Sequence, residues 1–331
     1  MRNRTYKYIL TFAFLGLLSS CIQEDLPPPQ AASQTSVCAN AESGSDFDKF
    51  MCQGSEVLRE VHPTADSSGY CPEDAKYGHY FVLIDTTEGY KEEQYVALMN
   101  KVLSPQMLEV MGPYDKLSIM KMAGTGDQAI ELMPNFSECK PRTGQPGSMY
   151  PINEFVPVST NAGILNGNNE EFVDQIKNST EEFSEMGNVI GDYSQILEVM
   201  QQLAQNSKWE FNNLQGYQYR KLIIFSDMIQ NSIDMKLVPS CGKQKGKCIT
   251  YDKLRKKYND EKWMNLKPIF GANPPDVHVY YLACKFDEDF DIGLMNQGGI
   301  WPSVFKEWGL KMTYTLENNC EDTFKTEAEA T

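Results

Sequence analysis

Two carboxylates come directly after apolar runs that predict buried strands. Residues 79–84 run into Asp85, and residues 220–225 run into Ser226 and Asp227. Short continuous apolar runs are typical of strands that are covered on both faces, as in a parallel sheet. In open α/β sheets, ligands bind beyond the carboxyl ends of the strands. Acids and hydroxyls at these ends would form an oxygen-rich cluster, which suits a hard divalent cation such as Mg²⁺.

Four of these oxygen-bearing residues resemble the metal-ion-dependent adhesion site of the von Willebrand factor A domain. That family has Asp-x-Ser-x-Ser after its first strand, a Thr on a loop before a helix, and an Asp after its fourth strand. Here Asp85, Thr87, Ser194 and Asp227 match in turn, and Gly89 replaces the third hydroxyl. The resemblance implies an α/β fold with a doubly wound, mostly parallel sheet and helices on both faces. It also implies that these four residues hold Mg²⁺, through which the domain binds a carboxylate of a partner protein.

Other interpretations of the same residues stay open. Asp85 and Asp227 could cap adjacent helices without any metal. A Mg²⁺-dependent phosphoester hydrolase resembling the haloacid dehalogenases would need an acid where Thr87 stands. The sequence has no Gly-x-Ser-x-Gly, Walker loop or His-Glu-x-x-His motif. We therefore expect a binding protein and not an enzyme, with the hydrolase and a structural lipoprotein with a vestigial metal site as alternatives.

The composition excludes one class of partner. The 331 residues are 41% hydrophobic, which is ordinary for a globular chain, and carry a net charge of −15. Because basic residues cluster only locally, we expect no nucleic-acid partner. The lysine-rich segment 243–262 is interpreted as a charged, solvated insert.

The N-terminus has the pattern of an export signal. A basic start is followed by an apolar stretch at residues 9–18, which is too short to span a bilayer. Leu18-Ser19-Ser20-Cys21 then resembles the bacterial lipoprotein signal, which implies cleavage before Cys21 and a lipid anchor on that cysteine. An ordinary cleaved signal is the alternative. The resemblance places the protein in the bacterial cell envelope, and in the outer membrane, facing the periplasm or the surface, if there are two membranes.

Eight cysteines remain after Cys21, and export implies an oxidising compartment in which disulfides persist. We expect disulfides among them, with Cys241–Cys248 as the candidate pair because glycines within that short loop favour a turn. The absence of a Cys-x-x-Cys pair and the scattered histidines argue against zinc.

The predicted organisation has five parts: signal peptide 1–20, lipidated tether 21–46, Cys-containing cap 47–76, A-type domain 77–318 with insertions near 134–168 and 236–262, and tail 319–331. Expected strands are 79–84, 116–122, 129–133, 220–225, 277–282 and 310–316. Expected helices are 92–103, 170–183, 195–205, 251–263 and 302–308. Three aromatic residues at helical spacing, Trp301, Phe305 and Trp308, are predicted to lie in the core, and His79 and His278 to be structural.

Overall fold

The fold comes from a computed structural model of the chain. It describes residues 38, 43–53, 71–73, 76–85, 96–123, 131–142, 162–185, 194–212, 216–232, 235, 237, 250–258, 260–282 and 293–317.

A six-stranded sheet organises these residues, in the order β3-β2-β1-β4-β5-β6. Its strands are β1 Gly78–Asp85, β2 Lys116–Ala123, β3 Glu131–Cys139, β4 Tyr219–Ser226, β5 Asp276–Leu282 and β6 Met312–Glu317. All neighbouring pairs are parallel except β2 and β3, which are antiparallel. The sheet is thus mixed and mostly parallel, and the predicted doubly wound α/β fold is confirmed.

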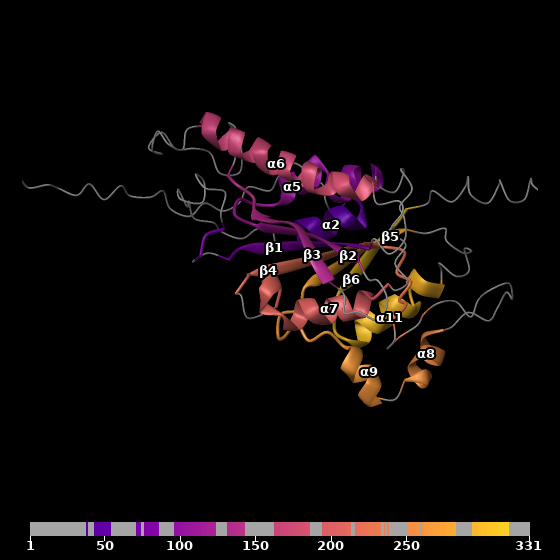
Figure 1. Ribbon diagram of the computed structural model, residues 1–331. Helices are drawn as coiled ribbons and strands as arrows, with labels where there is room; N and C mark the ends of the chain where they lie inside the picture. Colours follow the sequence, from indigo (N-terminus) through magenta and orange to yellow (C-terminus); the bar gives the residue numbers. More distant parts are fainter. Residues whose placement is uncertain are drawn as a thin grey trace, which may run out of the picture.

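Helices cover both faces of the sheet (Figure 1). One layer holds α2 Asp46–Cys52, α5 Pro105–Val110, α6 Ala162–Glu185 and a π-helical turn, η2 Leu98–Val102. The other holds α7 Ile196–Gln205, the short 3-10 turn η4 Ser207–Trp209, α8 Tyr251–Lys257, α9 Asp260–Leu266 and α11 Ile300–Glu307. Two apolar cores result, one on each side of the sheet.

The central strands are buried on both faces, as their mostly apolar sequences predict. Every residue of β1 is buried, and so is every residue of β4 except its first. Three predicted core residues are buried on the face of the sheet that α7 and α11 cover: Trp301, Phe305 and Trp308. His278 is buried within β5, where its ring nitrogens are hydrogen-bonded to Thr313 and Thr315 hydroxyls.

Regular elements of the fold occupy both ends of the range near 134–168, where the sequence predicts an insertion. Strand β3 continues to Cys139, and α6 already begins at Ala162. The sequence does not predict a strand across Pro134, because proline cannot donate a hydrogen bond to a β ladder and is confined to edge strands and bulges. Here β3 is an edge strand, and the register shifts between Ile119 and Met120, beside Pro134.

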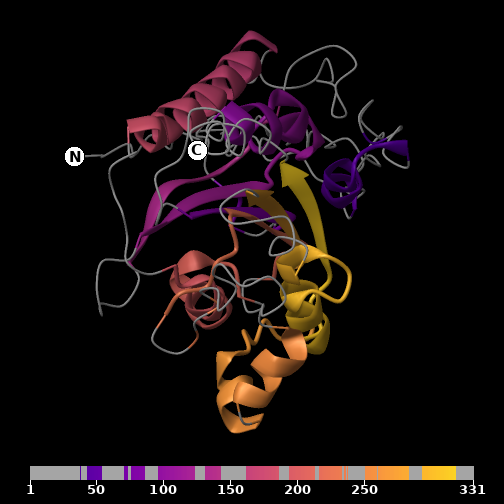
Figure 2. The ribbon, with the colours of Figure 1, turned by 90° about the vertical axis from the view of Figure 1, so that its right-hand side faces the viewer.

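The single charged helix predicted for 251–263 is wrong. The chain forms two short helices, α8 and α9, which project from the lower end of the molecule (Figure 2). Leu254, Trp263 and Leu266 are buried in the core of the lower layer. This part of the predicted insert is therefore anchored to the fold and is not wholly solvated.

Two disulfides join cysteines in the described residues. Cys38 is bonded to Cys52 at the end of α2, and Cys71 to Cys139 at the end of β3. The expectation of disulfides is thus confirmed for these four cysteines. The first bond also connects the predicted tether to the cap. Cys21, Cys241 and Cys248 lie outside the described residues.

None of the helices among the described residues combines the length and the apolar character needed to cross a bilayer.

Candidate functional site

The carboxyl ends of β1 and β4 form the topological switch point of the sheet. From β1 the parallel sheet continues to β2 on one side, and from β4 it continues to β5 on the other. In folds of this kind, ligands bind beyond the strand ends at the switch point. β1 and β4 pair in register, with Ile84 beside Phe225. Asp85 and Ser226 therefore end the two strands side by side.

Asp85 is the centre of a hydrogen-bonded cluster at this point. Its side chain is 5% exposed, and its Oδ2 accepts hydrogen bonds from Ser194 Oγ and Ser226 Oγ, both at 2.8 Å. Ser226 Oγ also accepts a bond from the backbone N–H of Met228 at 2.8 Å. Three elements thus converge on one carboxylate: β1, β4 and the start of α7.

Asp227 follows this cluster directly and shapes the loop after β4. Its Oδ1 accepts a bond from the N–H of Ile229 at 3.0 Å, the i to i+2 pattern of an Asx-turn. The next residues hold the start of α7: Gln230 Oε1 accepts from Leu197 N at 3.0 Å, and Asn231 N donates to Ser194 O at 2.6 Å.

The N-cap residue of α7 does not cap the helix with its side chain. This residue is Gln195, and its side chain makes no capping bond. Ser194 lies one residue before it and uses its hydroxyl on Asp85 instead. A side chain from the β4 loop, Gln230, satisfies an N–H of the first turn in its place.

Of the four predicted metal ligands, Asp85 and Ser194 are therefore in direct contact. Asp227 is adjacent in sequence to Ser226, which shares the contact with Asp85. Thr87 lies outside the described residues. The sequence predicts Ser226 at this strand end but not among the four predicted ligands, although strand alternation places it on the same face of β4 as Leu222 and Ile224.

The cluster offers oxygen donors alone, which is the ligand chemistry that Mg²⁺ prefers. Within the part of the chain that the structure describes, no group of three or more acidic, histidine or cysteine side chains is placed to hold a metal. Mg²⁺ does not need such a group, because it retains several waters and uses only one or two carboxylates. To bind Mg²⁺ through their oxygens, the hydroxyls of Ser194 and Ser226 would have to turn their hydrogens away from Asp85.

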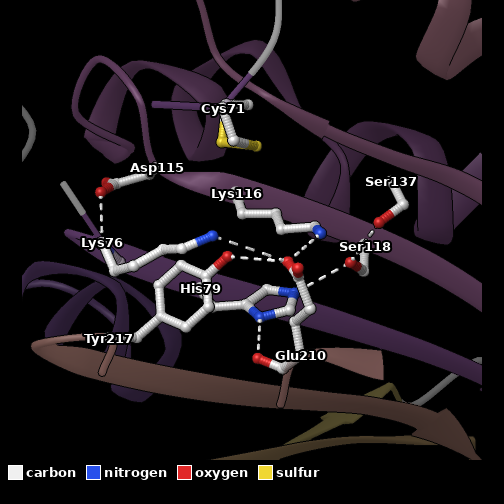
Figure 3. Close-up of a disulfide and its surroundings, with 11 residues drawn as sticks. Cys71, Lys76, His79, Asp115, Lys116, Ser118, Ser137, Glu210 and Tyr217 are labelled. Atoms are coloured by element: carbon white, nitrogen blue, oxygen red, sulfur yellow. Dashed lines mark hydrogen bonds and ion pairs between the residues drawn. A yellow bond between two sulfur atoms is a disulfide. The ribbon is translucent and has the colours of Figure 1, made fainter. Parts of the chain in front are cut away.

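A second polar cluster lies at the opposite ends of the same strands, near the Cys71–Cys139 disulfide (Figure 3). His79 Nδ1 faces the carbonyl oxygen of Glu210 at 3.1 Å, so this nitrogen donates and Nε2 accepts from Ser118 Oγ at 2.8 Å. Burial and the charge of Lys116 lower the pKa of His79 well below its ordinary value. Because His79 and Ser118 are both fully buried, this serine–histidine pair is structural, as predicted for His79.

Glu210 completes that cluster. Burial alone would raise its pKa, but the hydrogen bond and charge of Lys116, whose Nζ lies 2.6 Å from Oε2, keep the pKa below the usual value. Tyr217 OH donates to the same oxygen at 3.3 Å. The cluster ties β1 and β2 to the chain after α7.

Comparisons with known proteins identify no family. The chain matches no protein-family model and no curated protein. Among solved structures it is similar to the human COPII-coat protein Sec24c, with 12% sequence identity and a TM-score of 0.37. The similarity covers 77% of this chain and 31% of that one, so the chain spans about a third of the length of the protein it matches. At this identity and TM-score, the similarity says nothing about function.

Proposed function

We propose that this chain is a membrane-anchored envelope lipoprotein whose A-type domain binds a partner protein through a Mg²⁺-bridged carboxylate. The observation that supports the proposal best is the convergence of Asp85, Ser194 and Ser226 at the switch point of the sheet. The resemblance of Asp85, Thr87, Ser194 and Asp227 to an adhesion site favours the same reading. Lipidation of Cys21 would anchor the domain to the membrane.

The residues at the site fit the ion. Asp85 and Asp227 would supply the carboxylates, and Ser194, with Thr87, would supply hydroxyls. When bound, Mg²⁺ would present an open coordination position to a carboxylate of the partner. The chain's own part is to hold these groups on rigid strand ends, since Asp85 is buried at the end of the central strand β1.

A structural lipoprotein with a vestigial site is the second candidate. The two serine hydroxyls already satisfy Asp85 Oδ2 without an ion. A hydrolase has less support, because it would need an acid two residues after Asp85, where this chain has Thr87.

Capture of the partner from envelope extract tests the proposal. The bait is the full chain, with and without chelator, alongside Asp85→Asn and Asp227→Asn. Asp174→Asn, an exposed carboxylate on α6, is the matched control. The proposal expects one captured protein that is lost with chelator and in both site variants but retained by the control. Capture that survives chelator and both site variants would overturn the Mg²⁺ bridge.

A further inference from the structure

The helices α8 and α9 form a rigid projection below the sheet (Figures 1 and 2). Arg255 of α8 connects this projection to α11. Its guanidinium contacts Asp260 at 2.6 Å and Glu307 of α11 at 3.3 Å. The same group lies 5.2 Å from the ring centroid of Trp263, which is fully buried. Tyr251 also donates a hydrogen bond to Glu307. The outer surface of α8 is thus held in a fixed orientation relative to α11.

That outer surface is basic. Lys253, Lys256 and Lys257 stand at positions i, i+3 and i+4, so they share one face of α8, and all three are exposed. We call these three lysines the basic face. The inward side of the same helix carries the buried Leu254. In a chain with a net charge of −15, the basic face is a local reversal of sign.

Two exposed apolar side chains lie on α9 and just after it. Met264 of α9 is 52% exposed and Ile269, just after α9, is 65% exposed. These are the two most exposed large apolar side chains in the described residues. Surfaces that lie at a membrane interface combine two kinds of side chain: lysines, which meet anionic headgroups, and apolar groups, which enter the acyl boundary.

We infer that the basic face, with Met264 and Ile269, binds the anionic phospholipid headgroups of the membrane to which the chain is tethered. Cys38 lies 17 positions after the predicted lipid anchor at Cys21 and is bonded to Cys52 at the end of α2. A fully extended chain of that length reaches about 60 Å at most, so the domain stays close to the bilayer. The acidic remainder of the domain is repelled by an anionic surface, which favours approach through α8.

This inference rests on the membrane anchor of the proposed function and goes beyond it, and the metal site plays no part in it. Contact of the basic face with lipid would set the orientation of the domain on the membrane. The carboxyl ends of β1 and β4, where the candidate metal site lies, would then keep one fixed orientation relative to the membrane.

Flotation with lipid vesicles tests the inference directly. The probe is the mature chain from residue 21 onward with Cys21→Ser, so that neither the signal peptide nor a lipid anchor brings it to the vesicle. It should float with vesicles that contain phosphatidylglycerol and not with vesicles of phosphatidylcholine alone, and added salt should weaken the binding. The combined variant Lys253→Gln, Lys256→Gln and Lys257→Gln should lose about a hundredfold in affinity.

A matched control separates the basic face from overall charge. Lys49→Gln, Lys177→Gln and Lys208→Gln together remove the same charge from exposed positions on α2, α6 and η4. This control should bind nearly as well as the parent chain. Met264→Ser with Ile269→Ser should weaken binding while leaving its salt dependence unchanged.

Three outcomes would overturn the inference. One is equal binding to neutral and anionic vesicles. Another is an equal loss of affinity in the control variant and in the basic-face variant. The third is retention on polyglutamate without any binding to vesicles, which would assign the basic face to an acidic protein.

Discussion

Ser194 Oγ donates a hydrogen bond to Asp85 Oδ2 at 2.8 Å, although the two residues are 109 positions apart. This bond joins the start of α7 to the end of the central strand. Ser226 makes the equivalent bond from β4, so one buried carboxylate fixes both neighbours. The geometry of the candidate site is therefore set by Asp85.

Replacement of Asp85 by Ala should destabilise the metal-free protein. The hydroxyls of Ser194 and Ser226 would lose their shared acceptor inside the fold, which costs about 1–3 kcal/mol. Relief of repulsion between nearby carboxylates would act in the opposite direction, toward stabilisation. Thermal melting in the presence of chelator measures the difference. Asp85→Asn, which retains an acceptor oxygen, should melt close to the wild type, and a rise in melting temperature for Asp85→Ala would contradict the account.

Buried His278 should make the protein acid-sensitive. Burial lowers its pKa from 6.5 to about 3. The folded protein keeps this ring neutral while the unfolded chain protonates it below pH 6.5, so stability falls as pH drops from 6.5 toward 3. At pH 5 the loss relative to pH 7 is about 2 kcal/mol. Urea unfolding at both pH values, compared with His278→Gln, measures it.

Comparison with this variant isolates the contribution of His278 to the pH dependence of stability, because the carboxylates and His79 are present in both proteins. His278→Gln should lose less stability than the wild type between pH 7 and pH 5. Equal losses in the two proteins would show that His278 does not contribute.

The disulfide between Cys71 and Cys139 should stabilise the fold more than that between Cys38 and Cys52. The first closes a loop with a sequence separation of 68, and the second one of 14. Loop-closure entropy assigns them about 4 and about 3 kcal/mol, respectively. Paired Cys→Ser variants at each bond, compared by urea unfolding under oxidising conditions, measure both costs. A larger loss from the Cys38–Cys52 pair would contradict this ranking.

Lys221 should hold the N-terminal helix on the sheet. Its ammonium group donates to the carbonyl oxygens of Phe50 and Met51, in the last turn of α2, although it is buried in β4. Lys221→Met would leave both carbonyls without this donor, at a cost of about 1–3 kcal/mol. Hydrogen exchange should then show α2 opening more often while β1 stays protected. Lys140→Met, which removes the donor to Leu108 and Met111 at the end of α5, is the control and should leave α2 protected.

Parts of the fold that depend on local pattern could be predicted from the sequence. The buried strands β1, β4 and β5 follow from mostly apolar runs. Asp85 could be placed beside the end of β4 because parallel strands end at the same edge. Ser194 could be proposed because it precedes a helix with a clear apolar face. Its contact with Asp85 then follows from the packing of α7 on the sheet.

Features set by long-range packing could not be predicted. The extension of β3 through Pro134 is tolerated because β3 is an edge strand, which only the assembled sheet reveals. The pairing of Lys221 with α2 spans 170 residues, and no local pattern signals it.

Calorimetric titration of Mg²⁺ into the full chain carrying Cys21→Ser tests the central claim most directly. The account predicts saturable binding of one ion, lost in Asp85→Asn and weakened in Ser194→Ala, and unchanged in Asp174→Asn. Both site variants should remain folded by circular dichroism. Absence of saturable binding, or identical binding by the wild type and Asp85→Asn, would contradict the account and leave the Asp85 cluster as a structural tie between β1, β4 and α7.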